Sequence, residues 1–311
     1  MRTAVLVVVL VGLAARASAA FAFVARSTTC RRRYRDALLL ERIEAAHASK
    51  HADAVNDALC TNGVVRIDGA IDVSVADELL TYVNGALEEA LRSSRDSIML
   101  DAGDNYVQYF GNVLARQDLK CGTTRRHDLK LDLTPPVEAA LKDLLTNFGP
   151  ALSECLGADA VLYELAALIS DPGAPAQPFH PDTPFLDEQG VAVLTAFVAL
   201  QPIDETMGPT RFLPASHTAE DHAAFNARDD DGAAMLTLLR SRPCDSGLLG
   251  QGDATLFDSR LLHCGTANVS PRRRVLFYAS FRARDAKAPP GTLLYDLRER
   301  HSLQDWSSCW A

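Results

Sequence analysis

Residues 161–169 read VLYELAALI, residues 191–201 read VAVLTAFVALQ, and residues 274–281 read RVLFYASF. These apolar runs, and shorter ones at residues 210–213 and 254–257, alternate with turns rich in Gly, Pro and Asp. Many short strands at such spacing are typical of a β-sandwich or barrel and not of alternating βαβ units. The stretch therefore predicts a mainly β core over about residues 160–285.

The part of the chain before this core has a helical composition. Residues 36–60 are rich in Ala, Leu and Glu, and Ser74 with Asp77 matches a capping box that opens a second helix. Pro135 and Pro136 are suited to the first turn of a third helix. Residues 94–134 carry signals for turns and short strands. We expect a helical front over residues 36–150 that flanks the β core.

The first 35 residues read as a targeting sequence. An apolar run at residues 4–15 precedes the small residues Ala17, Ser18 and Ala19, which predicts a signal peptide over residues 1–19. The acid-free, Arg-bearing stretch at residues 20–35 resembles a plastid transit peptide. We therefore expect entry into the secretory route, with the plastid of an alga favoured and secretion or the ER lumen as the alternative. Residues 36–311 would then form a single domain.

The net charge of −9 is the sum of two unlike parts of the chain. Residues 1–35 hold seven arginines and no acid, which leaves 24 basic and 40 acidic residues, a net charge of −16, for the remainder. An acidic body disfavours nucleic acid and anionic membranes as partners, because neither polyanion would be attracted. We expect a small-molecule substrate and no stable membrane insertion once the leader is removed.

Cysteine usage gives no sign of a disulfide framework or a zinc site. The seven cysteines are scattered, their number is odd, and none forms a CxxC pair. Nucleotide-binding GxGxxG, P-loop and GxSxG motifs do not occur either. We expect reduced thiols.

The segment Pro178-Phe179-His180-Pro181-Asp182 contains an H-x-D pair. Residues two apart on an extended segment point to one side, so this imidazole and this carboxylate could grip one metal ion. A second histidine, His263, lies in the run Leu261-Leu262-His263. Two His and one carboxylate form the facial triad of non-heme Fe(II) oxygenases, which leaves open positions for a cosubstrate and O₂.

Arg274 opens the last strand of the predicted core. A buried guanidinium at the start of a strand needs a carboxylate partner, and the distal carboxylate of 2-oxoglutarate would suit a bidentate fork. Arg272 and Arg273 are adjacent competitors, and Arg272 would share the side of Arg274 if the strand extended that far. A solvated basic loop is the alternative interpretation of the three arginines.

These motifs resemble the phytanoyl-CoA dioxygenase (PhyH) family in their order and spacing. The matching residues are His180-x-Asp182, GPTRFLPASH at 208–217, Gly252-Asp253, FDSR at 257–260, His263 and Arg274. The family usually has Gly where Ala215 stands. The resemblance implies a double-stranded β-helix (a cupin-like jelly-roll) with N-terminal helices, Fe(II), and 2-oxoglutarate as cosubstrate.

The resemblance also assigns roles to residues. It makes His180, Asp182 and His263 the catalytic metal ligands and Arg274 the 2-oxoglutarate anchor. Thr195 and Phe197, on a strand that would line the pocket, are further cofactor-binding candidates, although core packing explains Phe197 equally well. Halogenating relatives lack the carboxylate of Asp182, so its presence favours hydroxylation of a small-molecule or acyl-type substrate.

Two other functions remain open at this point. The barrel could be a non-catalytic binding protein that retains the metal site, or it could use the same ligands as a hydrolase or isomerase.

Residues outside the triad have weaker signals. We expect a structural role for His217, a turn at Asp253, and packing for Cys264. The polar run from Arg125 to Lys130 is either a solvated loop or a region that contacts the substrate, with Lys130 as the candidate residue. Four further histidines are expected to be exposed: His47, His51, His222 and His301.

Overall fold

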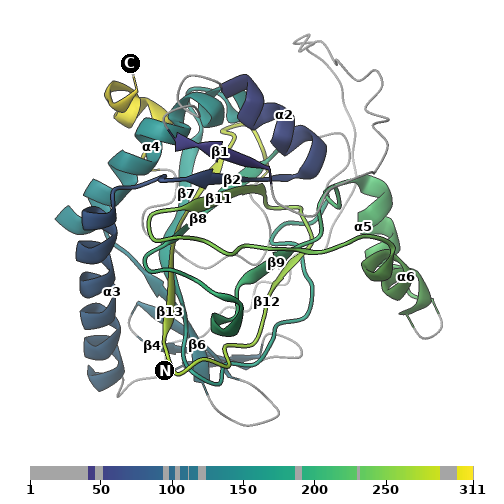
Figure 1. The fold of residues 1–311 in the computed structure, drawn as a ribbon, viewed down its shortest axis with the longest axis horizontal. Coiled ribbons are helices and arrows are strands. Elements are labelled where there is room, and N and C mark those ends of the chain that lie inside the picture. The colour runs from purple at the N-terminus through teal and green to yellow at the C-terminus, as the bar shows by residue number, and fades with distance from the viewer. Residues whose placement is uncertain are drawn as a thin grey trace, which may run out of the picture. The chain divides into compact units, whose positions relative to one another are not determined.

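Ten strands pair into one mixed sheet in this structure, a computed structural model of the 311-residue chain (Figure 1). The structure describes residues 41–45, 52–93, 98–101, 106–110, 112–117, 124–185, 191–229, 232–287 and 300–310. All of them belong to one compact unit, residues 36–311. The predicted leader, residues 1–35, lies outside the described residues, as do His47 and His51.

The large sheet contains strands from both the N-terminal and the C-terminal half of the described residues. Its strands, in spatial order, are β1 (Arg42–Glu44), β2 (Val64–Asp68), β11 (Ala254–Asp258), β8 (Val193–Ala199), β13 (Arg274–Arg282), β7 (Val161–Ser170), β6 (Thr124–Lys130), β5 (Val113–Gln117), β4 (Tyr106–Phe110) and β3 (Ile98–Asp101). A second sheet of three strands consists of β10 (Asp245–Ser246), β9 (Thr210–Phe212) and β12 (His263–Gly265). The predicted mainly β core is confirmed.

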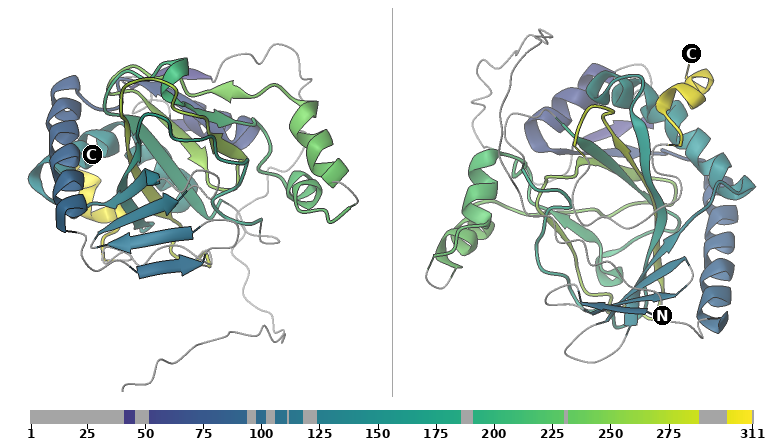
Figure 2. Two further views of the ribbon diagram at one scale, coloured as in Figure 1. Left: turned by 90° about the horizontal axis from the view of Figure 1, so that it is seen from below. Right: turned by 180° about the vertical axis from the view of Figure 1, so that it is seen from behind.

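Helices flank the two sheets on different sides. They are α2 (Ala52–Asn62), α3 (Val73–Ser93), α4 (Pro135–Leu156), α5 (Ala219–Phe225) and α6 (Ala233–Ser241), with short 3₁₀ turns η1 (Glu205–Met207) and η3 (Leu303–Cys309). Figures 1 and 2 show α3 and α4 on one side of the large sheet, and α5 and α6 on the far side, beside the small sheet. Among the described residues, no helix combines the length and the apolarity that a membrane span requires.

Strand alternation divides the apolar side chains into two cores. On β13, Val275 and Phe277 pack into the large core shared with α3 and α4, whereas Leu276 and Tyr278 pack into a smaller core between the sheets. Both faces of the strand are therefore buried, which explains why its sequence is an almost unbroken apolar run. The space between the sheets is where the functional side chains gather.

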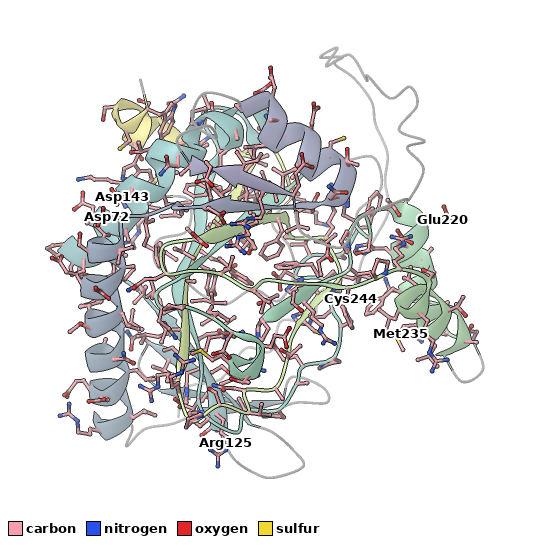
Figure 3. All side chains as sticks on the ribbon, in the orientation of Figure 1. Asp72, Arg125, Asp143, Glu220, Met235 and Cys244 are labelled. Atoms are coloured by element: carbon pink, nitrogen blue, oxygen red, sulfur yellow. The ribbon has the colours of Figure 1, made fainter. Side chains whose placement is uncertain are left out.

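The helical front follows the prediction in part. The helix at Pro135 begins at its first proline, as expected from the fixed φ of that residue. The helix near Ser74 begins at Val73, two residues earlier than a cap at Ser74 predicts, because Asp72 and not Ser74 accepts the capping bond: the backbone N–H of Ser74 donates to Asp72 Oδ1 at 2.7 Å. Asp72 in turn donates its N–H to Asp143 of α4 at 3.1 Å, which joins the two helices (Figure 3).

Residues 42–44 correct the expectation of a helix across residues 36–60. They form β1, which pairs in parallel with β2 at the sheet edge. Arg42 and Asp68 form an ion pair across this edge, so tertiary pairing overrides the local helical composition. The described helix of this region is α2, which starts at Ala52.

Candidate functional site

His180 and His263 come from different segments and meet across the small sheet. Each donates its backbone N–H to the carbonyl oxygen of the other, at 2.9 and 3.0 Å, so His180 adds an isolated bridge to β12. Their ring centroids lie 4.7 Å apart. Antiparallel pairing thus places two imidazoles side by side, and the backbone holds them there.

The two imidazoles are oriented by their own neighbours in the chain. Nδ1 of His180 lies 2.9 Å from the carbonyl oxygen of Pro178, and Nδ1 of His263 lies 2.9 Å from that of Leu261. A carbonyl only accepts, so each Nδ1 carries a proton, and in the neutral imidazole the lone pair is then on Nε2. This second contact is the usual way in which a metal-binding histidine is fixed in its tautomer.

Asp182 completes the group from the side of the cavity. Its carboxylate oxygens lie 3.9 Å from Nε2 of His180 and 3.6 Å from Nε2 of His263. One ligand atom of each of the three residues lies within 4.8 Å of the others, so that within the described part of the chain these three side chains form a group that could hold a metal ion. The backbone N–H of Asp182 donates to Ser259 at 2.9 Å, which anchors the segment.

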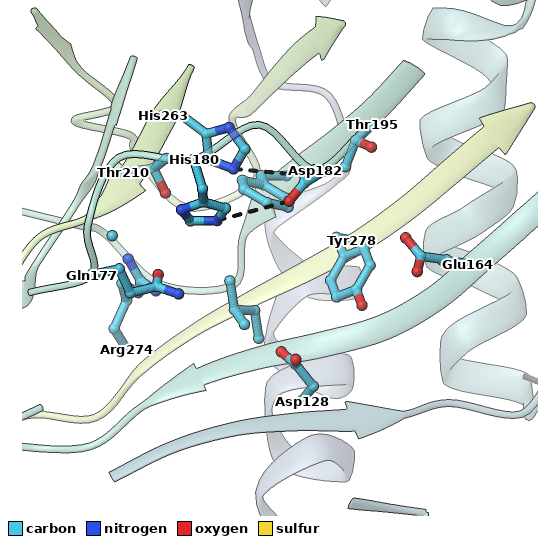
Figure 4. Close-up of a pocket in the computed structure, with 13 residues that line it drawn as sticks. Asp128, Glu164, Gln177, His180, Asp182, Thr195, Thr210, His263, Arg274 and Tyr278 are labelled. Carbon is cyan, nitrogen blue, oxygen red and sulfur yellow. Dashed lines mark ion pairs between the residues drawn. The ribbon is translucent and has the colours of Figure 1, made fainter. Parts of the chain in front are cut away.

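The three side chains face a cavity of about 200 Å³ between the sheets. Figure 4 shows the triad on one wall and Asp128, Glu164 and Tyr278 on the opposite wall. The lining residues are Asp128, Glu164, Leu168, Gln177, His180, Asp182, Thr195, Phe197, Thr210, His263, Gly265, Arg274 and Tyr278. The site is thus a mixed polar and apolar chamber next to three groups suited to iron.

Arg274 lies in the same cavity and is fully buried. Its Nη1 donates to the carbonyl oxygen of Gly208, while Nε and Nη2 have no hydrogen-bond partner in the structure. Burial lowers the pKa of Arg274 to about 9, and the nearby guanidinium of Arg126 acts in the same direction. A buried cation with two unsatisfied donors is a costly arrangement that a bound carboxylate would relieve.

The structure distinguishes Arg274 from its two neighbours. Arg272 is 55% exposed and forms an ion pair with Asp204 at 2.6 Å. Arg273 pairs with Asp171 at 2.5 Å on the other face of the sheet. β13 begins only at Arg274, so Arg272 is outside the strand and does not share its inward direction. Of the three, Arg274 alone lines the cavity.

Thr195 and Phe197 both line the cavity, as the sequence suggested. Phe197 also packs in the inner core, with its ring 4.9 Å from that of Phe257 and 5.8 Å from that of Tyr278. Thr195 has a hydrogen bond to Ser280, with 3.0 Å between the oxygens. Their assignment as cofactor-binding residues stays a prediction.

The polar run Arg125–Lys130 forms the inner strand β6 and is not a solvated loop. Arg126, His127 and Asp128 are buried, and it is Asp128, not Lys130, that lines the cavity. Sequence reasoning also missed Glu164 and Tyr278, which lie on strands that read as apolar runs. The spacing of two between Arg126, Asp128 and Lys130, which places the three on one face of a strand, was the available signal, and it could be used only once the strand was known.

His222 is a second correction, because it is buried and not exposed. Its Nδ1 accepts the backbone N–H of Phe185 at 3.3 Å, so its Nε2 is the donor to the carbonyl oxygen of Arg260 at 2.6 Å. The side chain of Arg260 forms an ion pair with Asp258 at 2.5 Å. His222 therefore joins α5 to the segment that follows Asp182 and to the turn that precedes His263.

His301, expected to be exposed, is half-buried, with its ring centroid 5.4 Å from that of Trp306. Three other expectations agree with the geometry. Nε2 of His217 lies 3.3 Å from the carbonyl oxygen of Cys60, a structural contact outside the cavity. Asp253 accepts from the backbone N–H groups of Gly250 and Gly69, at 2.8 and 2.9 Å, within a turn. Cys264 is buried and unpaired with another cysteine.

Comparisons with known proteins identify the family and the fold. A model of the phytanoyl-CoA dioxygenase (PhyH) family matches residues 59–276. No curated protein sequence matches the chain. Among solved structures, three similar ones are an epimerase, a carbocyclase and a third protein whose description gives no activity.

The epimerase is SnoN, a non-heme alpha-ketoglutarate-dependent enzyme from nogalamycin biosynthesis, at 20% identity and a TM-score of 0.51 over 81% of this chain and 93% of that one. It has also been solved with Fe³⁺, alpha-ketoglutarate and nogalamycin RO. The carbocyclase SnoK, from the same biosynthesis, is 18% identical, with a TM-score of 0.53 over 82% of this chain and 96% of that one. AviO1 from Streptomyces viridochromogenes Tue57 is 16% identical, with a TM-score of 0.54 over 77% of this chain and 98% of that one. At these sequence identities the three solved structures show that the chain has the same fold, and they show nothing about its reaction.

Proposed function

The chain belongs to the phytanoyl-CoA dioxygenase family, whose cofactors are Fe(II) and 2-oxoglutarate, and we propose that it hydroxylates a small-molecule or acyl-type substrate. The observation that carries the proposal is the position of Arg274. A fully buried guanidinium with two unpartnered donors opens into the same cavity as three metal-binding side chains. That combination matches a cosubstrate with one end at the metal and a carboxylate at the other.

In this proposal His180, Asp182 and His263 hold Fe(II), and Arg274 holds the distal carboxylate of 2-oxoglutarate. The donor set suits iron, since neutral imidazoles and one carboxylate are the ligands of a facial triad. When bound, iron would activate O₂ as the oxidant, with two electrons from the decarboxylation of 2-oxoglutarate and two from the substrate C–H bond, which would become an alcohol.

The protein's own part in the reaction is to orient its ligands and to exclude water. The carbonyl oxygens of Pro178 and Leu261 hold the protons on the Nδ1 atoms, so that both Nε2 lone pairs would be available to a metal ion. Phe197 closes the inner side of His263, with 6.5 Å between ring centroids, and gives that side of the site an apolar cover. Rigid surroundings of this kind keep the reacting atoms in register.

Asp182 favours hydroxylation over halogenation, because a carboxylate already takes the ligand position that a halide would need. SnoN and SnoK, which share the fold, carry out epimerisation and carbocyclisation. The outcome must therefore be measured from the product. Hydroxylation adds one oxygen atom from O₂, epimerisation adds none, and ring closure removes two hydrogens.

The first test is anaerobic addition of Fe(II) and 2-oxoglutarate to the purified, reduced protein. A visible charge-transfer band is expected for the wild type, and Arg274→Met and His180→Ala should abolish it. A wild-type protein with no band would instead favour a non-catalytic binding protein. Once a substrate is known, mass spectrometry with isotope-labelled O₂ tests for incorporation of one oxygen atom.

The site of action is proposed from the leader alone. Residues 1–19 would direct the chain into the secretory route and residues 20–35 into a plastid. A fluorescent protein carrying residues 1–35 should accumulate in the plastid of an alga with an endomembrane-enclosed plastid. Accumulation in the ER or the medium would refute the plastid assignment.

A further inference from the structure

We propose that Gln177 determines the selectivity for the cosubstrate: its side-chain amide donates a hydrogen bond to the distal carboxylate of 2-oxoglutarate beside Arg274, and Gly265 leaves the space in which that amide lies. This inference rests on the proposed function, because it concerns the same cavity with 2-oxoglutarate in place. Neither Gln177 nor Gly265 is among the motif residues through which the chain resembles its family.

The backbone of Gln177 is fixed beside the metal-binding segment. Its N–H donates to the carbonyl oxygen of Gly265 at 2.8 Å, next to the bridge that pairs His180 with His263. Gly265 lies opposite Thr210 in the register of β12 and β9. Gln177, Gly265 and Thr210 all line the cavity. Because the backbone makes these contacts, a substitution of the Gln177 side chain should leave the segment in place.

The guanidinium of Arg274 lies at the same end of the cavity. Its Nη1 donates to the carbonyl oxygen of Gly208, two residues before Thr210 in the chain, while Nε and Nη2 have no acceptor. A carboxylate has two oxygens with about four lone-pair positions in all. A carboxylate that takes both unused donors of Arg274 can therefore accept a further hydrogen bond from a neighbouring side chain.

Gly265 allows the amide of Gln177 to occupy this place. A Cβ on Gly265 would lie 2.5 Å from Oε1 of Gln177 and 3.0 Å from Nη1 of Arg126. The end of the Gln177 side chain thus fills the volume that a side chain at position 265 would need. The φ of Gly265 is outside the left-handed region, so the reason for a glycine here is space and not backbone conformation.

Charge orients the amide of Gln177. Its Oε1 and Nη1 of Arg126 approach the same point beside Gly265. A guanidinium only donates, so the acceptor end of the amide faces Arg126 and the NH₂ group is directed away from it. Figure 4 shows the amide nitrogen of Gln177 pointing into the chamber next to Arg274. An anion bound there would meet donors from both side chains.

A neutral amide adds selectivity to this end of the site without adding charge. A distal carboxylate accepts its N–H, whereas a methyl group in the same position would leave the N–H without a partner. Sites built to hydrogen-bond a ligand group discriminate strongly against a ligand that lacks it, because their polar atoms then stay unpaired. Gln177 should therefore favour a dicarboxylic over a monocarboxylic 2-oxo acid of the same length.

Two probes separate this role from a structural one: 2-oxoglutarate and 2-oxopentanoate, which share the chelating end and differ in the distal carboxylate. Anaerobic titration of the Fe(II)-loaded protein, followed by the charge-transfer band, gives the Kd of each. Gln177→Ala should raise the Kd for 2-oxoglutarate by at least about tenfold and leave that for 2-oxopentanoate within about twofold, since only the former loses a charged hydrogen bond. The affinity for Fe(II) without a keto acid should not change.

Gly265→Ala tests the space that the amide occupies. Its Cβ would displace the flexible end of Gln177, so the same selective loss of 2-oxoglutarate binding is expected with the amide still present. In the Gln177→Ala background, Gly265→Ala should add little, because its effect acts through Gln177. Gln304→Ala is the matched control, since Gln304 is exposed on η3, and it should change neither Kd.

The inference is overturned if Gln177→Ala keeps the wild-type Kd for 2-oxoglutarate, or if it raises the Kd of both acids by the same factor. Gln177→Glu decides the matter should the alanine variants not fold, because it keeps the side-chain shape and places a negative charge beside the distal carboxylate. Unchanged 2-oxoglutarate affinity in Gln177→Glu would likewise refute the inference.

The proposed function and this inference fail in different ways. A wild type that shows no band with Fe(II) and 2-oxoglutarate refutes the proposed function, and this inference with it. A wild type that shows the band, together with variants of unaltered Kd, refutes the role of Gln177 alone.

Discussion

His180 and His263 are paired through their backbones, each N–H donating to the other's carbonyl oxygen, at 2.9 and 3.0 Å. The bridge sets the spacing of the two backbones by strand pairing, and the contacts of the two Nδ1 atoms with carbonyl oxygens orient the rings. Removing one ligand side chain should therefore leave the fold intact. This allows loss of metal binding to be separated from loss of structure.

Asp182→Asn should weaken Fe(II) binding by at least about tenfold, since a direct ligand matters no less than the outer contacts of a metal site. The substitution keeps the side-chain shape, and the bond from its backbone to Ser259 stays in place. Competition with a chelator measures the affinity, and circular dichroism checks the fold. Wild-type iron affinity in this variant would contradict the role of Asp182, and Glu154→Gln serves as the control carboxylate.

Arg274→Met should leave the ligand-free protein as stable as the wild type or more stable. The folded-state pKa of about 9 shows that folding buries this cation at a cost of several kcal/mol. Buried charges replaced by apolar groups of similar volume often have this effect. In the variant, 2-oxoglutarate should no longer raise the Tm. A large fall in the Tm of the ligand-free variant would show that Arg274 is structural.

Arg274 also predicts how stability depends on pH. Its folded-state pKa is lowered, so above about pH 9 the folded chain releases a proton that the unfolded chain still binds. Stability from this group should therefore rise with pH above that point. Urea titrations from pH 8 to about 10 measure the unfolding free energies of the wild type and of Arg274→Met. The unfolding free energy of the wild type should rise relative to that of the variant as the pH increases. A difference independent of pH would be inconsistent with the buried cation.

Gly208→Ala should destabilise the protein by about 1–3 kcal/mol. Gly208 has a φ of +74°, and a Cβ there would lie 2.5 Å from the backbone oxygen of Thr266, which cannot move aside. The same residue accepts from Arg274, so 2-oxoglutarate binding should weaken as well. Gly85→Ala in α3 is the matched control, because a Cβ meets nothing within 4 Å, and it should stabilise by about 0.5–1 kcal/mol. Thermal unfolding of both variants checks the pair.

Cys264 and Cys155 should resist alkylation by iodoacetamide at pH 8 in the folded protein. Burial raises the pKa of Cys264 to about 11 and that of Cys155 to about 12, so on the order of one thiol in a thousand or fewer is ionised. Cys60 is exposed and should react before the other four cysteines of the described residues. Peptide mapping after a short exposure gives the order, and rapid labelling of Cys264 would contradict its burial.

Much of the fold could be predicted because its signals are local. The apolar runs predicted the strands β7, β8, β9, β11 and β13 to within two residues at each end. The Pro pair marked the first residue of α4, because a proline at the start of a helix loses no hydrogen bond. Local composition failed for residues 42–44, where pairing with β2 decides the structure.

The sequence by itself determined which residues could form the site: an H-x-D pair, a later histidine and an arginine that opens a strand. Only the tertiary structure decided that His180 and His263 are backbone partners, that Arg274 and not Arg272 faces the cavity, and that Glu164 lies on the wall opposite the triad. It also buried His222, which joins α5 to the segment after Asp182. The physical reason is that residue spacing fixes directions only within one strand. The register between strands far apart in the chain is set by packing of the two cores, so the partners across the cavity appear only when those cores have formed.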